Sequence, residues 1–159
     1  MATQTVYNRI GSKRHLLVGL QEVIEEAGEV SGIQRRIAES GDPREVVASV
    51  ARLRRLMMEG AGDIVSFIHA AAASDADVGA AYAASQARSR AGIARFTARL
   101  ASLDALRDDL DVDRATDIAY SILHHAIWTR LIDECGWSAD EAERWYADTL
   151  TRVLLPSDR

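Results

Sequence analysis

The chain has little cysteine and proline and no long apolar run, and each shortage excludes a class of protein. Cys135 is the single cysteine among 159 residues, which excludes an internal disulfide and fits a reducing compartment. No apolar run approaches the ~20 residues that span a membrane, and the first residues lack the apolar core of a signal peptide. The sequence therefore predicts a cytoplasmic protein with no membrane partner.

Basic residues do not exceed acidic ones. The chain has 19 lysines and arginines against 24 aspartates and glutamates, a net charge of -5, so most of its surface is unsuited to nucleic acid. The beginning of the chain differs, because Arg9, Lys13 and Arg14 precede the first acidic residue, Glu22. This charge asymmetry predicts a small basic segment on an acidic body.

The chain is instead rich in helix-forming residues at helical spacing. Alanine, leucine, arginine and glutamate abound, only two prolines occur, and no segment has the alternation of a strand, so the predicted class is all-α. We expect helices over about 2–9, 12–40, 43–60, 64–73, 75–103, 112–135 and 138–155. Gly60-Ala61-Gly62 should separate two of them. Helix caps are expected at Asp42, Asp75, Asp111 and Ser138, the last in a Ser138-Ala-Asp-Glu141 capping box.

Two segments carry a family pattern. Thr5-Val-Tyr-Asn-Arg-Ile-Gly-Ser-Lys-Arg-His-Leu16 resembles the recognition helix and following turn of TetR-family repressors. The segments 115–120, 128–138 and 143–155 resemble the last two helices of that family, which form a four-helix bundle across a two-fold dimer. The resemblance implies a partial helix-turn-helix over 1–17, lacking its first two helices, and a ligand-binding and dimerisation domain over 18–159.

The resemblance also implies which residues contact DNA. Tyr7 and Lys13 match positions that contact phosphates, and the short polar side chains of Thr3, Gln4, Thr5 and Asn8 suit base edges. A polar helix end without any DNA role has a similar composition. Because two helices normally hold the recognition helix in place, we expect the chain as written to bind no operator tightly.

A ligand pocket among the middle helices is the second expected site. Aromatic and sulfur-containing side chains with one polar anchor suit a small organic ligand, although ordinary core packing also explains each of them. The candidates are Met57, Phe67, Tyr82, Phe96, Tyr120 and His124. Arginines 35, 36, 52, 54 and 55 are expected to form a solvated face.

Metal binding, a cofactor and catalysis are not expected. His124 and His125 are adjacent, so on a helix they point about 100° apart and do not readily share one ion. No metal-binding motif and no nucleophile with a neighbouring base is recognisable. The sequence therefore predicts a binding protein and not an enzyme.

A homodimer is expected through the last two helices. The segment 112–135 is apolar on two sides, whereas a surface helix needs one buried stripe, so the second side requires a partner or further burial inside the monomer. The expected interface residues are Ile122, His125, Ala126, Thr129, Trp145 and Thr149.

These features together predict a TetR-like, ligand-responsive transcriptional repressor whose partners are a DNA operator, a small organic ligand and a second copy of itself. In this mechanism a ligand changes the tilt of the helix that follows Ser12 and so releases DNA. The alternative is a dimeric module for a small molecule or protein that has lost DNA binding.

Overall fold

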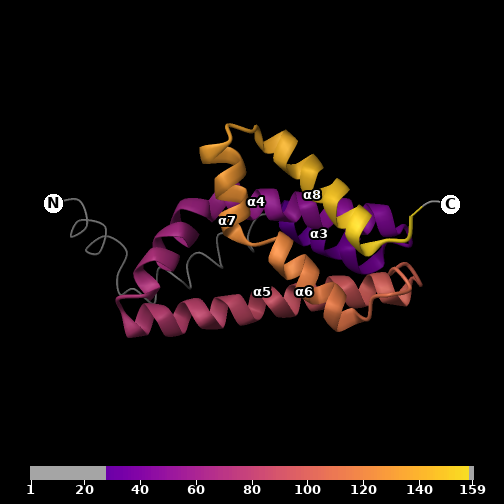
Figure 1. The fold of residues 1–159 in the computed structure, drawn as a ribbon, viewed down its shortest axis with the longest axis horizontal. Helices are drawn as coiled ribbons and strands as arrows, with labels where there is room; N and C mark the ends of the chain where they lie inside the picture. The colour runs from indigo at the N-terminus through magenta and orange to yellow at the C-terminus, as the bar shows by residue number, and fades with distance from the viewer. Residues whose placement is uncertain (1–27, 158–159) are drawn as a thin grey trace.

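Seven helical elements follow one another in the computed structural model, which describes residues 28–157 apart from the side chains of Asp63, Ile64 and Phe67. They are α3 (Gly28–Glu39), α4 (Pro43–Ala72), α5 (Ala76–Ser102), α6 (Val112–Ile122), α7 (His125–Thr129), the π-helix η1 (Arg130–Glu134) and α8 (Ala139–Leu154). Residues 28–157 contain no strand, so the predicted all-α class is confirmed. Figure 1 shows α4 and α5 as two long helices, with the shorter helices packed along them.

Four of the described helices, α4, α5, α6 and α8, begin at the residues that the sequence predicts. Asp42 accepts a hydrogen bond from the backbone of α4, Asp75 from that of α5 and Asp111 from that of α6. Ser138 and Glu141 form the expected capping box of α8, in which each side chain accepts from the other residue's backbone N–H. Because the first turn of a helix leaves backbone donors unpaired, these side chains determine where each helix starts.

One predicted interruption is wrong: α4 continues through Gly60-Ala61-Gly62 to Ala72. Glycine inside a helix costs only about 1 kcal/mol relative to alanine, which tertiary packing can offset. Ala61 is 3% exposed and Met58 is 6% exposed, so this part of α4 is packed against the core. Figure 1 shows that the ribbon of α4 changes direction along its length while staying helical.

The core lies where α4, α5, α6 and α8 meet. Val46 and Val47 of α4 and Leu150 and Leu154 of α8 are fully buried, and α4 is the helix that contacts α3, α5, α7 and α8. The remaining core side chains include Ala51, Phe96, Leu100, Ala115, Ala119, Trp128, Ala142 and Tyr146. Because α4 packs against these four helices, its side chains can contact parts of the chain that are distant in sequence.

The predicted single helix over 112–135 is also wrong. It divides into α6, α7 and η1, with Leu123 ending α6 and His124 capping α7 in an extended conformation (φ -65°, ψ 139°). Leu123 and His125 are each 7% exposed. At 100° a residue, a continuous helix would direct these two side chains to nearly opposite sides. The break lets both be buried.

In the described part of the chain, no helix is both long enough and apolar enough to cross a membrane.

Candidate functional site

A group of polar side chains gathers where α4, α5, α7 and α8 come together. α4 supplies two of its members, α5 one, the start of α7 two, and α8 one. We call this group the polar cluster; its members are Arg54, His69, Tyr82, His124, His125 and Tyr146. Polar groups at helix contacts are unusual unless they are paired with one another or with a ligand, so this cluster is the candidate functional site.

The three histidines are in ring contact. The ring centroids of His124 and His125 are 4.3 Å apart, and those of His69 and His125 are 4.8 Å apart. His69 Nδ1 and the Tyr82 hydroxyl are hydrogen-bonded at 2.9 Å, which links α4 to α5. His124 Nδ1 accepts a hydrogen bond from the Ala126 backbone N–H at 3.3 Å. The break after α6 therefore turns both neighbouring histidines toward His69.

Arg54 and Tyr146 form the other end of the cluster. Arg54 Nε and Nη2 and the Tyr146 hydroxyl are buried and have no hydrogen-bond partner among the described residues. Burial lowers the pKa of Arg54, and the neighbouring Tyr146 is the one described group that opposes this. Burial likewise raises the pKa of Tyr146. Tyr146 stacks on Trp128, with centroids 6.2 Å apart and planes 7° from parallel. The cluster thus contains a buried guanidinium that has no counter-charge among the described side chains.

The histidines beside Arg54 are held neutral. Burial, followed by the proximity of His124, His69 and Arg54, lowers the pKa of His125 to about 4. Burial and then the charge of Arg54 lower the pKa of His124. At neutral pH these two rings therefore act as neutral hydrogen-bonding groups beside the positively charged Arg54.

Within residues 28–157, no set of three or more His, Cys, Asp or Glu side chains is placed to hold a metal ion. The contacts of the three histidines in the structure are hydrogen bonds and ring contacts.

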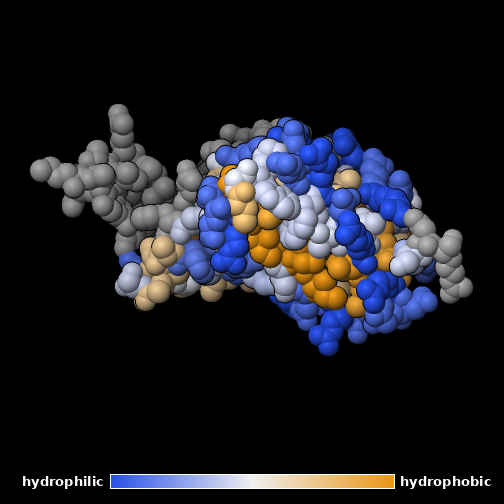
Figure 2. Space-filling model, turned by 45° about the horizontal axis from the view of Figure 1, so that its top comes forward, coloured by the Kyte–Doolittle hydropathy of each residue, from blue (hydrophilic) through white to orange (hydrophobic). Residues whose placement is uncertain are grey.

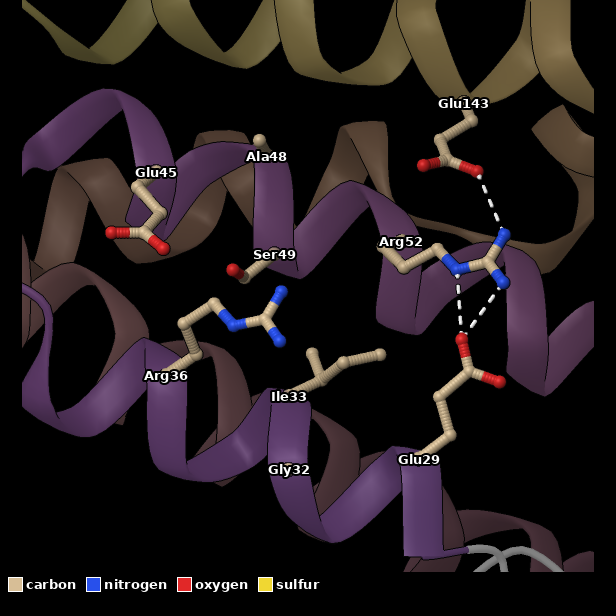
Figure 3. Close-up of a pocket in the computed structure, with 9 residues that line it drawn as sticks. All are labelled: Glu29, Gly32, Ile33, Arg36, Glu45, Ala48, Ser49, Arg52 and Glu143. Atoms are coloured by element: carbon tan, nitrogen blue, oxygen red, sulfur yellow. Dashed lines mark hydrogen bonds and ion pairs between the residues drawn. The ribbon is translucent and has the colours of Figure 1, made fainter.

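A separate open groove of about 440 Å³ lies between α3, α4 and α8 (Figure 3). Arg52 of α4 lies at one end, where its Nη2 contacts Glu29 of α3 at 2.8 Å and its Nη1 contacts Glu143 of α8 at 3.4 Å. Arg36 points into the space between Ile33 and α4 (Figure 3). The rest of the lining comes from Gly32, Glu45, Ala48 and Ser49.

Five arginines were expected to form a solvated face, and this expectation is wrong for three of them. Arg52 and Arg55 are partly buried and make ion pairs between helices; Arg55 reaches Asp140 and Glu143 of α8. Arg54 is the member of the polar cluster described above. Arg35 and Arg36 are exposed. The apparent charged face is therefore largely a contact surface between α4 and its neighbours.

The structure brings together some of the predicted ligand residues. Tyr82 and His124 both belong to the polar cluster, connected through His69. Phe96 is 2% exposed and packs in the core, whereas Met57 is partly buried on α4. Tyr120 is partly buried with the guanidinium of Arg90 5.7 Å from its ring centre. The side chain of Phe67 lies outside the described residues. None of the other five lines the groove of Figure 3, and the predicted pocket among the six stays a prediction.

The predicted interface residues differ in exposure. Ala126 is exposed, and Ile122, Thr129, Trp145 and Thr149 are partly exposed. His125 is only 7% exposed and contacts His69 and His124, so it is buried within its own chain and offers little surface to a partner. The predicted DNA-contacting residues all lie outside the described part of the chain; they are Thr3, Gln4, Thr5, Tyr7, Asn8 and Lys13.

Sequence reasoning missed Arg54, His69 and Tyr146 as site residues. A signal existed for Tyr146, because Ala142, Tyr146, Leu150 and Leu154 recur every four residues and all are buried. Arg54 and His69 gave no comparable signal, since their neighbours lie on other helices, Tyr146 for Arg54 and Tyr82 and His125 for His69.

Comparison of the chain with models of known protein families, with curated proteins and with solved structures finds no match. The fold and the polar cluster define an all-α protein with a buried guanidinium where α4 meets α8.

Proposed function

We propose that residues 28–157 form the ligand-binding and dimerisation part of a TetR-like transcriptional repressor. The observation that carries this proposal is the polar cluster, in which Arg54 and Tyr146 present unpaired buried donors next to neutral histidines. Such groups are costly to bury alone and are characteristic of sites completed by a bound molecule. The repressor role itself is supported by the resemblance of the Thr5–Leu16 segment.

An apolar surface supports the dimer. On α8, Trp145 and Val153 are partly exposed beside the fully buried Tyr146 and Leu154, and on α6 Ile122 is partly exposed. Figure 2 shows a hydrophobic band across one face of the molecule, over the region of α6 and α8. An apolar band of this kind on helices that already bury one stripe suits a self-complementary helix-to-helix contact. We therefore assign a second copy of the chain as the partner that covers this apolar band.

Ion pairs connect α3 and α8 to the part of α4 that carries Arg54 of the polar cluster. Arg52 holds Glu29 of α3 and Glu143 of α8, and Glu143 also accepts from Arg55. Arg54 lies on the same helix, between these two arginines, and faces Tyr146 of α8. A ligand that shifts α8 against α4 would therefore act on the contact that positions α3. In the proposed mechanism α3 belongs to the helix leading toward the DNA-contacting segment.

Binding to promoter DNA tests the proposal. The full chain, and the same chain extended by any in-frame residues encoded upstream of Met1, would be titrated with DNA from the promoter of its own gene at physiological salt. We expect at least the extended form to bind this DNA specifically, and Lys13→Ala to weaken binding. A dimer that binds no promoter sequence in either form would overturn the repressor role and favour the alternative, a dimeric binding module without DNA affinity.

A further inference from the structure

Three of the four buried polar atoms that lack partners in the described residues meet at one place. They are Arg54 Nε, Arg54 Nη2 and the Tyr146 hydroxyl, at the contact between α4 and α8; the fourth is Arg99 Nε. Arg99 differs because its Nη2 donates to the Ser40 carbonyl at 2.8 Å. A buried cation without a partner is strongly destabilising, so Arg54 requires an anion from elsewhere.

The free edge of Arg54 is the one that fits a carboxylate. Nε and Nη2 carry two parallel N–H groups, which match the two oxygens of a carboxylate. Other arginines of this chain use the same edge in that way. Arg107 donates from Nε to Asp109 Oδ1 at 2.9 Å and from Nη2 to Oδ2 at 2.7 Å. Arg52 directs its Nε and Nη2 to Glu29 Oε1 at 3.2 and 2.8 Å. On Arg54 this edge has no acceptor among residues 28–157.

The surroundings favour an organic acid over a hydrated inorganic anion. Tyr146 lies beside the Arg54 guanidinium and stacks on Trp128, which is 6% exposed, so buried aromatic side chains adjoin the charged group. The Tyr146 hydroxyl adds a third donor beside the charged edge. Such an arrangement pairs one anionic group with an apolar body.

The element next to the cluster is suited to move. α7 has five residues and lies between the break at His124 and the π-helix η1. Its cap is the 3.3 Å hydrogen bond from Ala126 N–H to His124 Nδ1, which is long for a hydrogen bond of this kind. π-helical turns are frequent at functional sites. A shift of α7 would move Trp128, which stacks on Tyr146 beside Arg54.

We infer that the effector of this protein is a small organic carboxylate with an apolar body, whose carboxylate pairs with Arg54 and Tyr146 beside α7. This inference rests on the proposed ligand-binding role and gives its chemical class. The neutral histidines add hydrogen-bonding capacity without competing for the negative charge.

Matched acids and alcohols test it by isothermal titration calorimetry on the full chain. The probes are octanoate against octanol and phenylacetate against 2-phenylethanol. We expect at least one acid to bind about tenfold more tightly than its alcohol, as charge-assisted hydrogen bonds predict. Arg54→Met should abolish that advantage, whereas Arg88→Met, at an exposed position on α5, should leave it unchanged. Acids that bind no better than their alcohols, or an advantage that survives in Arg54→Met, would overturn the inference.

A second measurement does not need a ligand. Because Arg54 is buried without a counter-charge, Arg54→Met should raise the midpoint of thermal unfolding of the ligand-free chain. A lower midpoint would mean that the chain itself pairs Arg54, which contradicts an effector carboxylate there. The promoter titration is independent of both measurements. Acid binding without promoter binding would overturn the repressor role alone, and promoter binding without an acid preference would overturn the carboxylate alone.

Discussion

Thr97 Oγ1 and Thr116 Oγ1 lie 2.7 Å apart in the buried contact between α5 and α6. Each hydroxyl also has a backbone acceptor, the Val112 carbonyl at 2.7 Å for Thr116 and the Ala94 carbonyl at 3.2 Å for Thr97, so one hydroxyl donates to the other while its partner donates to a carbonyl. Thr97 and Thr116 are 0% and 3% exposed, so this bond is buried. The pair fixes the register of α6 on α5, and with it the place where α6 ends before the histidines.

Valine substitutions test this pair. Thr97→Val and Thr116→Val should each lower the free energy of unfolding by about 1 kcal/mol, because each removes the shared hydrogen bond from a buried site. The double variant should cost clearly less than the two singles together, since two apolar side chains leave no unpaired hydroxyl. Urea denaturation of the four proteins gives the comparison. Strictly additive losses would show that the two hydroxyls do not interact.

Alanine substitutions at two glycine positions should change the stability of the fold in opposite directions. Gly60 lies inside α4 and a Cβ built there has no atom within 4 Å, so Gly60→Ala should stabilise the protein by about 0.5–1 kcal/mol. Gly136 has φ +71°, a conformation that disfavours side chains, so Gly136→Ala should destabilise it by about 1 kcal/mol. The midpoints of thermal unfolding of the two variants, compared with that of the wild type, test both expectations. A loss of stability in Gly60→Ala would contradict the continuous helix.

Acid should destabilise the fold through His125. Its pKa falls from an ordinary 6.5 to about 4 in the folded chain, so the unfolded chain binds the extra proton between these values. This contribution to stability is therefore complete above pH 6.5 and is lost as the pH falls toward 4, by about 2 kcal/mol. Carboxylates titrate in the same range, so the measurement is the difference between wild type and His125→Gln in urea denaturation across pH 4–7. Parallel curves would exclude a neutral, buried His125.

The proposed dimer makes a prediction about α7. Ala126 is exposed beside the partly exposed Ile127, and a charge there would be buried in the expected contact. Ala126→Glu should convert the dimer to a monomer in sedimentation equilibrium at micromolar concentration, because an unpaired charge in an apolar interface is strongly unfavourable. Ala87→Glu, at an exposed position on α5, is the matched control and should remain dimeric. A wild-type chain that sediments as a monomer would contradict the dimer itself.

The sequence by itself determined the helical class and most helix starts. Asp75 and Ser138 cap α5 and α8 as predicted, because capping depends on a side chain and a backbone N–H within three residues of it. The buried stripe of α8 is similarly local, since its period follows from helix geometry.

Only the tertiary structure decided where helices continue or break. Gly60 and Gly62 lie inside α4 because packing around Ala61 outweighs their low helix propensity. The segment after Ile122 breaks because Leu123 and His125 are buried together, which one continuous helix does not permit.

The candidate site depended on the tertiary structure even more strongly. His69 and His124 are 55 positions apart in sequence numbering yet have ring centroids 6.4 Å apart, and no local pattern relates them. Arg52, Arg54 and Arg55 lie within four residues of one another and carry the same charge, so the sequence does not distinguish Arg54 from the other two. Its different role arises because those two face carboxylates of α3 and α8, while Arg54 faces Tyr146. Local sequence determines which groups are charged; the packing of distant helices determines which charge remains unpaired.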